Sequence, residues 1–210
     1  MNNAFKPVMD AMLAHLVAAA TITFTATATL NNPTLTGVSN FAGLIPGLPV
    51  FGPGGDRGTT IQTINHGAGT ITLTDPLTAN ASAGQYTTGF LTTGRRAIHW
   101  SQVSAQPALF LRRIGVTDED DEPFTKTTLE CEAWIYCNAG QNPDVAPDDA
   151  LTALEQMIRT SFVPDGADDD DRFTLGGLAH RCRIEGRSDI SPGDQGPQAI
   201  ARIPIRITLP

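Results

Sequence analysis

The sequence predicts an α+β fold in which an antiparallel sheet carries two helices on one face and an all-β inserted domain interrupts the chain. Three observations lead to this prediction. Two segments alternate between apolar and polar residues, two others repeat apolar residues at helical spacing, and one long segment is almost free of charge.

Two segments have the period of a half-buried strand, and we expect them to pair in one sheet. In residues 199–209, within the region 180–210, and in residues 126–138, one side of the strand is apolar. The apolar sides consist of Ala201, Ile203, Ile205, Ile207 and Leu209 in the later segment and of Leu129, Cys131, Ala133, Ile135 and Cys137 in the earlier one. We therefore expect other elements of the chain to bury one face of this sheet.

Two helices are expected to supply that cover. Residues 5–17 place an apolar stripe on one side of a helix, and residues 147–162 do the same. The stripes consist of Phe5, Val8, Met9, Met12, Leu13, Leu16 and Val17 in the first segment and of Leu151, Leu154, Met157, Ile158 and Phe162 in the second.

The composition changes abruptly at residue 21. Residues 21–93 contain only three charged side chains, Asp56, Arg57 and Asp75. Short alternating runs separated by turns rich in glycine and proline fill this segment, which predicts a compact all-β module. Residues 1–20 and 94–210 then form one α+β domain, so we expect the two ends of the module to lie close together.

Two further expectations concern the connecting segments. Residues 97–103 and 108–114 are expected to form a hairpin ahead of the strand at 126–138. The acidic run at 118–122 is expected to be a solvated loop. A second acidic cluster at 165–171 lacks the spaced carboxylates, glycine and distal glutamate of a calcium-binding loop.

Composition restricts the class of protein. With 210 residues, of which 40% are hydrophobic, the chain can bury a core of its own, and its net charge of -8 does not favour nucleic acid or an anionic membrane as a general partner. No apolar run is long enough to span a bilayer and no secretion signal is recognised, so a cytosolic product is expected. Cys131, Cys137 and Cys182 lack the paired spacing of a zinc site or disulfide framework, which predicts buried thiols.

Catalytic motifs are absent from the sequence. It contains no G-x-S-x-G elbow, no phosphate-binding loop and no H-E-x-x-H pair, and its four histidines lie on different segments. We therefore expect a protein without enzymatic activity and without a cofactor or metal.

The candidate functional residues lie on the side of the sheet that the helices leave uncovered. They are Glu130, Glu132, Trp134, Tyr136, Arg181, Arg183, Arg202 and Arg206, with Glu185 and Arg187 beside them. Cross-strand ion pairs on a solvated sheet would account for the charges. Aromatic and arginine side chains on a flat sheet are also typical of subunit interfaces, so this face is the candidate oligomer or partner interface.

Several segments together resemble the tail terminator proteins of long-tailed bacteriophages. They are the first helix, Arg95-Arg96, Gln106-Pro107-Ala108-Leu109-Phe110, Thr128-Leu129-Glu130-Cys131-Glu132-Ala133-Trp134-Ile135-Tyr136, the second helix, and Gly193-Asp194-Gln195-Gly196-Pro197-Gln198-Ala199-Ile200-Ala201-Arg202-Ile203-Pro204-Ile205. The resemblance covers residues 1–20 and 94–210, while residues 21–93 look like the small β-modules of phage structural and fibre proteins.

The resemblance implies a virion structural protein that forms a hexameric ring in the tail and neck. Such a ring caps the tail tube, stops its elongation and joins it to the head completion or stopper protein, and DNA only passes through its lumen. Assembly would take place in the cytoplasm of the bacterial host, without a membrane. Two alternatives are a connector or stopper at the head and a carbohydrate-binding adhesin of the virion.

Overall fold

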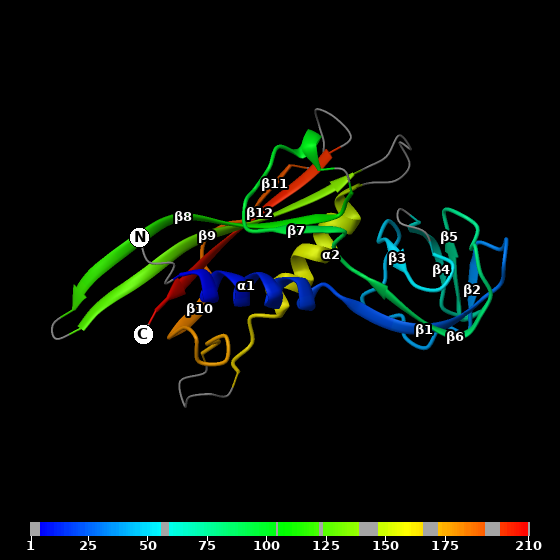
Figure 1. Ribbon diagram of the computed structural model, residues 1–210, viewed down its shortest axis with the longest axis horizontal. Coiled ribbons are helices and arrows are strands. Elements are labelled where there is room, and N and C mark those ends of the chain that lie inside the picture. The colour runs from blue at the N-terminus through cyan, green and yellow to red at the C-terminus, as the bar shows by residue number, and fades with distance from the viewer. Residues whose placement is uncertain are drawn as a thin grey trace.

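The chain folds into two β-sheets and two α-helices over the residues that the computed structural model describes, which are 5–55, 59–103, 105–121, 124–138, 147–165, 172–191 and 198–209. Each sheet has six strands, and their pairing is antiparallel except for one parallel pair. The prediction of a mixed α+β fold with two helices is therefore confirmed. Figure 1 shows an elongated molecule in which the smaller sheet occupies one end and both helices lie against the larger sheet.

The larger sheet contains the strands predicted from the alternating pattern. Its strands are β7 (Thr92–Gly94), β8 (Ala108–Asp121), β9 (Phe124–Asn138), β12 (Gln198–Thr208) and β10 (Arg181–Ile184), in the spatial order β10-β12-β9-β8-β7, and β11 (Asp189–Ser191) also pairs with β12. Ile203 faces Ala133 and Ile205 faces Cys131 across β12 and β9. These four side chains are buried, so the predicted apolar side of each strand is the core side.

Both predicted helices are present and cover the core side of this sheet. Helix α1 (Lys6–Ala19) buries Met12 and Leu16, and α2 (Pro147–Thr160) buries Leu151 and Leu154 in the same apolar core. Pro7 stands in the first turn of α1, where its missing N–H costs no helical hydrogen bond. Neither α1 nor α2 covers the opposite side of the sheet (Figure 1).

The smaller sheet is formed by residues 22–88. Its strands are β1 (Ile22–Ala28), β2 (Thr34–Thr36), β3 (Val50–Phe51), β4 (Ile61–Asn65), β5 (Thr70–Leu73) and β6 (Ala81–Thr88), in the spatial order β3-β6-β1-β2-β5-β4. One face is buried, with Phe24 stacked on Tyr86 at a centroid distance of 5.6 Å. The positions of β1 that alternate with the buried ones are threonines, Thr23, Thr25 and Thr27, and these are exposed.

The two sheets share a continuous apolar core. A methyl group on Gly43, in the loop before β3, would lie only 3.2 Å from Cε of Met157 on α2 and 3.0 Å from Cδ1 of Ile22. The loop before β3 therefore lies against α2, in addition to the two chain connections that join the smaller sheet to α1 and β7. The boundary expected at residue 94 falls inside β7, since Thr92 and Thr93 pair with Ala108 and Leu109 of the larger sheet.

The predicted hairpin ahead of the main strand is wrong. Residues 97–99 have no strand conformation, and Trp100–Gln102 form a short 3-10 helix. The partner of β8 on that side is β7, in parallel pairing. The physical reason is that Ile98 and Val103 pack onto the sheet next to Phe110 and Tyr136 instead of extending its edge.

The acidic run is part of a strand and not the loop that the sequence suggested. Residues 118–121 continue β8 and pair with β9, where the Thr127 hydroxyl donates a 2.7 Å hydrogen bond to Oδ1 of Asp118. Cross-strand partners thus compensate for the low strand propensity of aspartate. Glu122 lies outside the described residues.

Asp165 is the described member of the second acidic cluster, and its role is structural. Its carboxylate accepts hydrogen bonds from the backbone N–H and hydroxyl of Thr174 and from the N–H of Gly176. Residues 166–171 lie outside the described part of the chain.

Candidate interaction surface

The side of the larger sheet that faces away from α1 and α2 is the open face. Strand register places three rows of side chains on it. Phe110, Trp134 and Arg202 form one row, Arg112, Glu132 and Pro204 the next, and Glu130, Arg206 and Arg183 a third that runs onto β10. Seven of the eight residues singled out from the sequence stand on this face with their side chains partly or fully exposed, and Tyr136 is the exception.

Trp134 is the centre of the open face. Its ring lies 5.4 Å from the guanidinium carbon of Arg202 and 5.9 Å from that of Arg112, within the range of a cation–π interaction. Its indole Nε1 donates a 2.9 Å hydrogen bond to Glu132. A half-buried tryptophan held by two arginines is a rigid anchor of the kind that dominates protein interfaces.

Arg112 was missed by the sequence reasoning. It lies in the run 108–114, which was assigned to a hairpin ahead of the sheet and not to the sheet itself. The alternation of Leu109 and Leu111 with Phe110 and Arg112 was the available signal, because it places Arg112 on the side away from the core.

Arg183, Arg202 and Arg206 of the open face form ion pairs. Arg206 contacts Glu185 at 2.9 Å and Glu130 at 3.4 Å, and Arg183 contacts Glu185 at 2.6 Å. Arg202 contacts Asp189 of β11 at 2.6 Å. All of these side chains are exposed to solvent, so each pair contributes at most a few tenths of a kcal/mol to stability. Their main effect is to hold the charges in a fixed pattern.

Tyr136 does not belong to the accessible part of this surface. It is only 3% exposed because the segment 97–103 folds over it, and its hydroxyl donates a 3.1 Å hydrogen bond to the carbonyl of Ile98. Burial raises the pKa of this phenol. The expectation that Tyr136 contributes directly to an interface is therefore not supported by its position.

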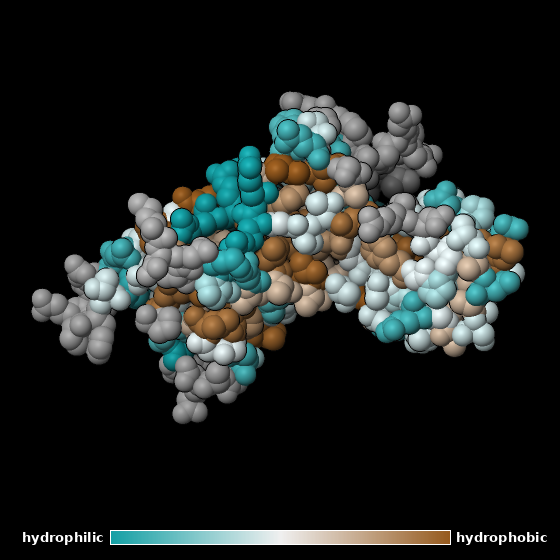
Figure 2. Space-filling view, viewed as in Figure 1, coloured by the Kyte–Doolittle hydropathy of each residue, from teal (hydrophilic) through white to brown (hydrophobic). Residues whose placement is uncertain are grey.

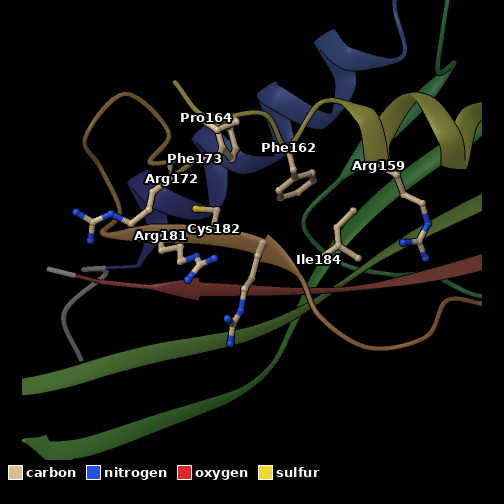
Figure 3. A pocket seen from close by; sticks show the side chains of 9 residues that line it. Arg159, Phe162, Pro164, Arg172, Phe173, Arg181, Cys182 and Ile184 are labelled. Carbon is tan, nitrogen blue, oxygen red and sulfur yellow. The ribbon is translucent and has the colours of Figure 1, made fainter. Parts of the chain in front are cut away.

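A basic depression lies where β10 meets the segment that follows α2. One part of it, about 290 Å³ in volume, is lined by residues from both segments, and Figure 3 shows Arg159, Phe162 and Pro164 on one side and Arg181, Cys182 and Ile184 on the other. An adjoining part of about 400 Å³ is lined by Lys126 and His180 among others. Arg172 lies within hydrogen-bonding distance of the His180 ring. The depression can hold an anionic group of a partner.

A histidine and a serine come together at a half-buried position, His15 of α1 and Ser161 after α2. Nε2 of His15 lies 2.9 Å from Oγ of Ser161, and that hydroxyl donates its own proton to the carbonyl of Ile158 at 2.7 Å. The serine oxygen therefore accepts from the histidine, so His15 cannot act as the base that would activate it.

The cysteines are buried, as predicted. Burial raises the pKa of Cys131, Cys137 and Cys182 to about 12 in each case. Within the described part of the chain, no three side chains of the metal-ligating types come together.

Neither described helix is long and apolar enough to cross a bilayer. The candidate sites described so far are the open face around Trp134 and the basic depression lined by Arg159, Arg181 and Arg183. No model of a known protein family matches this chain, and no curated protein matches its sequence.

Proposed function

We propose that the protein is a virion structural protein of the tail terminator type, which forms a hexameric ring on the tail tube of a long-tailed bacteriophage. The observation that carries the proposal is the open face, where Trp134 is held between Arg112 and Arg202. An aromatic anchor within fixed, mixed charges favours a specific protein partner. The resemblance of the segments quoted above to tail terminator proteins suggests three partners. They are a neighbouring copy of the chain, the tail tube and the head completion protein.

The mechanism requires surface complementarity and no chemistry. Each copy in a ring uses one surface to meet a different surface on the next copy, and the rotation closes the ring. A ring that presents a tube-like surface on one side only would bind the growing end and offer no site for another tube subunit. Tube growth would then stop at the ring.

We further propose that residues 21–93, or the slightly shorter segment that ends before β7, are an inserted all-β module projecting from this ring. Ile22 pairs with Thr88, so the module could have been inserted at a single point of the parent domain. Its outward positions on β1 are Thr23, Thr25 and Thr27, which offer hydroxyl groups and no charge.

The proposal is tested by negative-stain microscopy and a tube assay. The wild-type protein should form rings and keep polymerising tail tubes at a defined length. The double variant Trp134→Ala with Arg202→Glu should lose both properties, because it removes the anchor and reverses the adjacent charge. The control Asp75→Lys changes an exposed charge at a turn that follows β5, away from Trp134, and should behave as wild type. Rings that bind portal complexes but not tubes would assign the protein to the head connector.

A further inference from the structure

Strand β8 has an unpaired edge. One side of β8 pairs with β9 from Ala108 to Asp121, whereas β7 covers the other side only as far as Phe110. Beyond Phe110, no described strand lies along the outer edge. Figure 1 shows this part of β8 extending with β9 beyond the helices. Such an edge offers free N–H and C=O groups to an added strand.

The same edge exposes apolar side chains. Ile114 is 47% exposed and Val116 is 42% exposed, and both rank among the most exposed large hydrophobic residues of the described chain. They stand at the centre of the unpaired stretch. An edge of this length with apolar residues at its centre favours association with a second strand.

Charge is divided sharply along the edge. The unpaired stretch begins with Arg112 and Arg113 and ends with Asp118-Glu119-Asp120-Asp121. Within the described residues, neither arginine makes an ion pair, and their partners are the rings of Trp134 and Phe5. One strand therefore carries a cationic end and an anionic end.

Two more arginines extend the cationic end. Arg95 and Arg96 follow directly after β7 and line a depression of about 420 Å³ together with Arg113 and Met9. Asp10 is the acidic neighbour there, at 3.0 Å from Arg95. Figure 2 shows a hydrophilic patch over β8 and the N-terminal part of α1, the region in which these residues lie. Like charges this close together favour an anionic partner.

A β-bulge between Arg113 and Gly115 sets the directions of these charges. Arg112 pairs with Glu132 and Glu119 pairs with Lys126, so both point to the open face. Arg113 pairs with Cys131 and Asp118 pairs with Thr127, so both point to the other face. Without the extra residue of the bulge, Arg112 and Glu119 would lie on opposite faces, and so would Arg113 and Asp118.

We propose that the outer edge of β8 pairs antiparallel with the same edge of a second copy of this chain, about a two-fold axis near Gly115 and Val116. In this pairing Arg112 faces Glu119 of the second copy on the open side, and Arg113 faces Asp118 of the second copy on the other side. Each contact occurs twice because of the two-fold symmetry.

A second copy fits this edge better than a nucleic acid does. Phosphates would neutralise the arginines but would use neither the strand edge nor Ile114 and Val116, and they would be repelled by the acidic end and by the net charge of -8. A parallel arrangement of two β8 edges would bring like charges together. Only the antiparallel arrangement places the arginines of each copy opposite the acidic residues of the other copy.

This contact is distinct from the ring proposed above, because a two-fold contact joins pairs and does not continue around a ring. It would join two chains, or two rings face to face. Breaking it should therefore halve the mass of the particle in either case. The size of the remaining unit, one chain or one ring, reports separately on the proposed function.

The test uses the single charge reversals Arg113→Glu and Asp118→Lys, both of which point away from the open face. Mass is measured by size-exclusion chromatography with light scattering at low and moderate salt. Each variant alone should have about half the mass of the wild type, since both symmetric contacts become repulsive. An equimolar mixture of the two should regain the wild-type mass, and so should the double variant, because opposite charges then face each other again. Thermal unfolding of each variant checks that the fold is kept.

A cysteine cross-link tests the geometry independently. Val116→Cys lies next to the two-fold axis and should form an intermolecular disulfide under mild oxidation, whereas Leu30→Cys, at the similar exposure of 46% in the native leucine, should not. Wild-type mass in both single reversals, or a mixture that stays at half mass, would overturn the proposal. So would a wild-type protein that shows no pairing but binds a short oligonucleotide through Arg113, since that would make the arginine cluster a phosphate site.

Discussion

Ile22 and Thr88 face each other across β1 and β6, so the chain enters and leaves the smaller sheet at one point. Deleting residues 22–90 and closing the gap with a short glycine linker should therefore leave a folded core with cooperative thermal unfolding. Its free energy of unfolding should fall, because Met157 of α2 loses the loop that contacts it. Loss of cooperative unfolding would show that the two sheets form one inseparable unit.

The deletion of residues 22–93 is the matched comparison, since it also removes Thr92 and Thr93 from β7. Three residue pairs join β7 to β8, and Leu91 adds an N–H hydrogen bond of 2.8 Å to the carbonyl of Pro107. The longer deletion should be less stable than the shorter one by about 1–3 kcal/mol, at about 1 kcal/mol for each lost hydrogen bond. Denaturant titration of both proteins measures this difference.

Core positions of β12 and β9 should not tolerate charge. Ile203 and Ile135 are fully buried between the sheet and the helices. Ile203→Asp or Ile135→Asp should lower the free energy of unfolding by about 3 kcal/mol or more, because the new carboxylate has no partner there. Asp75→Asn, at an exposed turn, should change it by under about 0.5 kcal/mol. Equal effects at the core and the turn would mean that the strand faces are misassigned.

Periodicity predicted β9, β12, the two α-helices and their buried faces correctly because the burial of apolar side chains determines them. Ile203, Cys131 and Leu154 occur at positions where only one side of a strand or helix can enter the core. The same reasoning places Trp134 and Arg202 on the open face. Such positions are set by local spacing and do not depend on distant contacts.

The predictions for residues 97–103 and 118–121 were wrong because contacts with other segments determine the structure there. Residues 97–103 have the composition of a strand, but Tyr136 and Phe110 offer them an apolar surface to cover. The aspartates of 118–121 are weak strand formers, yet they continue β8 because β9 supplies a partner at every position. The spacing of residues within 97–103 or within 118–121 predicts neither contact, since each contact is made with a different segment of the chain.

The cysteines should be unreactive in the folded protein. Burial raises the pKa of all three thiols to about 12, so almost no thiolate exists at neutral pH. Titration with a disulfide reagent at pH 8 should detect essentially no thiol in the native protein and all three after unfolding in guanidinium chloride. Rapid reaction of one native thiol would show that its strand opens locally.

His15 should make the fold sensitive to mild acid. Burial lowers the pKa of His15, which packs against Phe173 at 4.4 Å, so the folded state binds its proton less readily than the unfolded state. As the pH falls below the ordinary value of 6.5, the unfolded state gains a proton that the folded state lacks, and stability is lost. Above that pH this loss of stability does not occur, and the free energy of unfolding keeps its full value.

Unfolding in urea between pH 7.5 and pH 5 tests this. His15→Gln should unfold with a weaker dependence on pH than the wild-type protein. An unchanged pH dependence in His15→Gln would show that the histidine titrates equally in both states.

Trp134 and Tyr136 are neighbours on the open face, but they should respond differently to substitution. Tyr136→Phe removes one hydrogen bond to the carbonyl of Ile98, which should cost about 0.5–1.5 kcal/mol and leave the oligomer unchanged, because the ring stays buried. Trp134→Ala removes the ring that Arg112 and Arg202 flank and should reduce the particle mass and tube binding. Light scattering and a tube-binding assay on both variants, each with its unfolding curve, separate the two roles. If Tyr136→Phe lowers the mass as much as Trp134→Ala does, the segment 97–103 and not the tryptophan forms the contact.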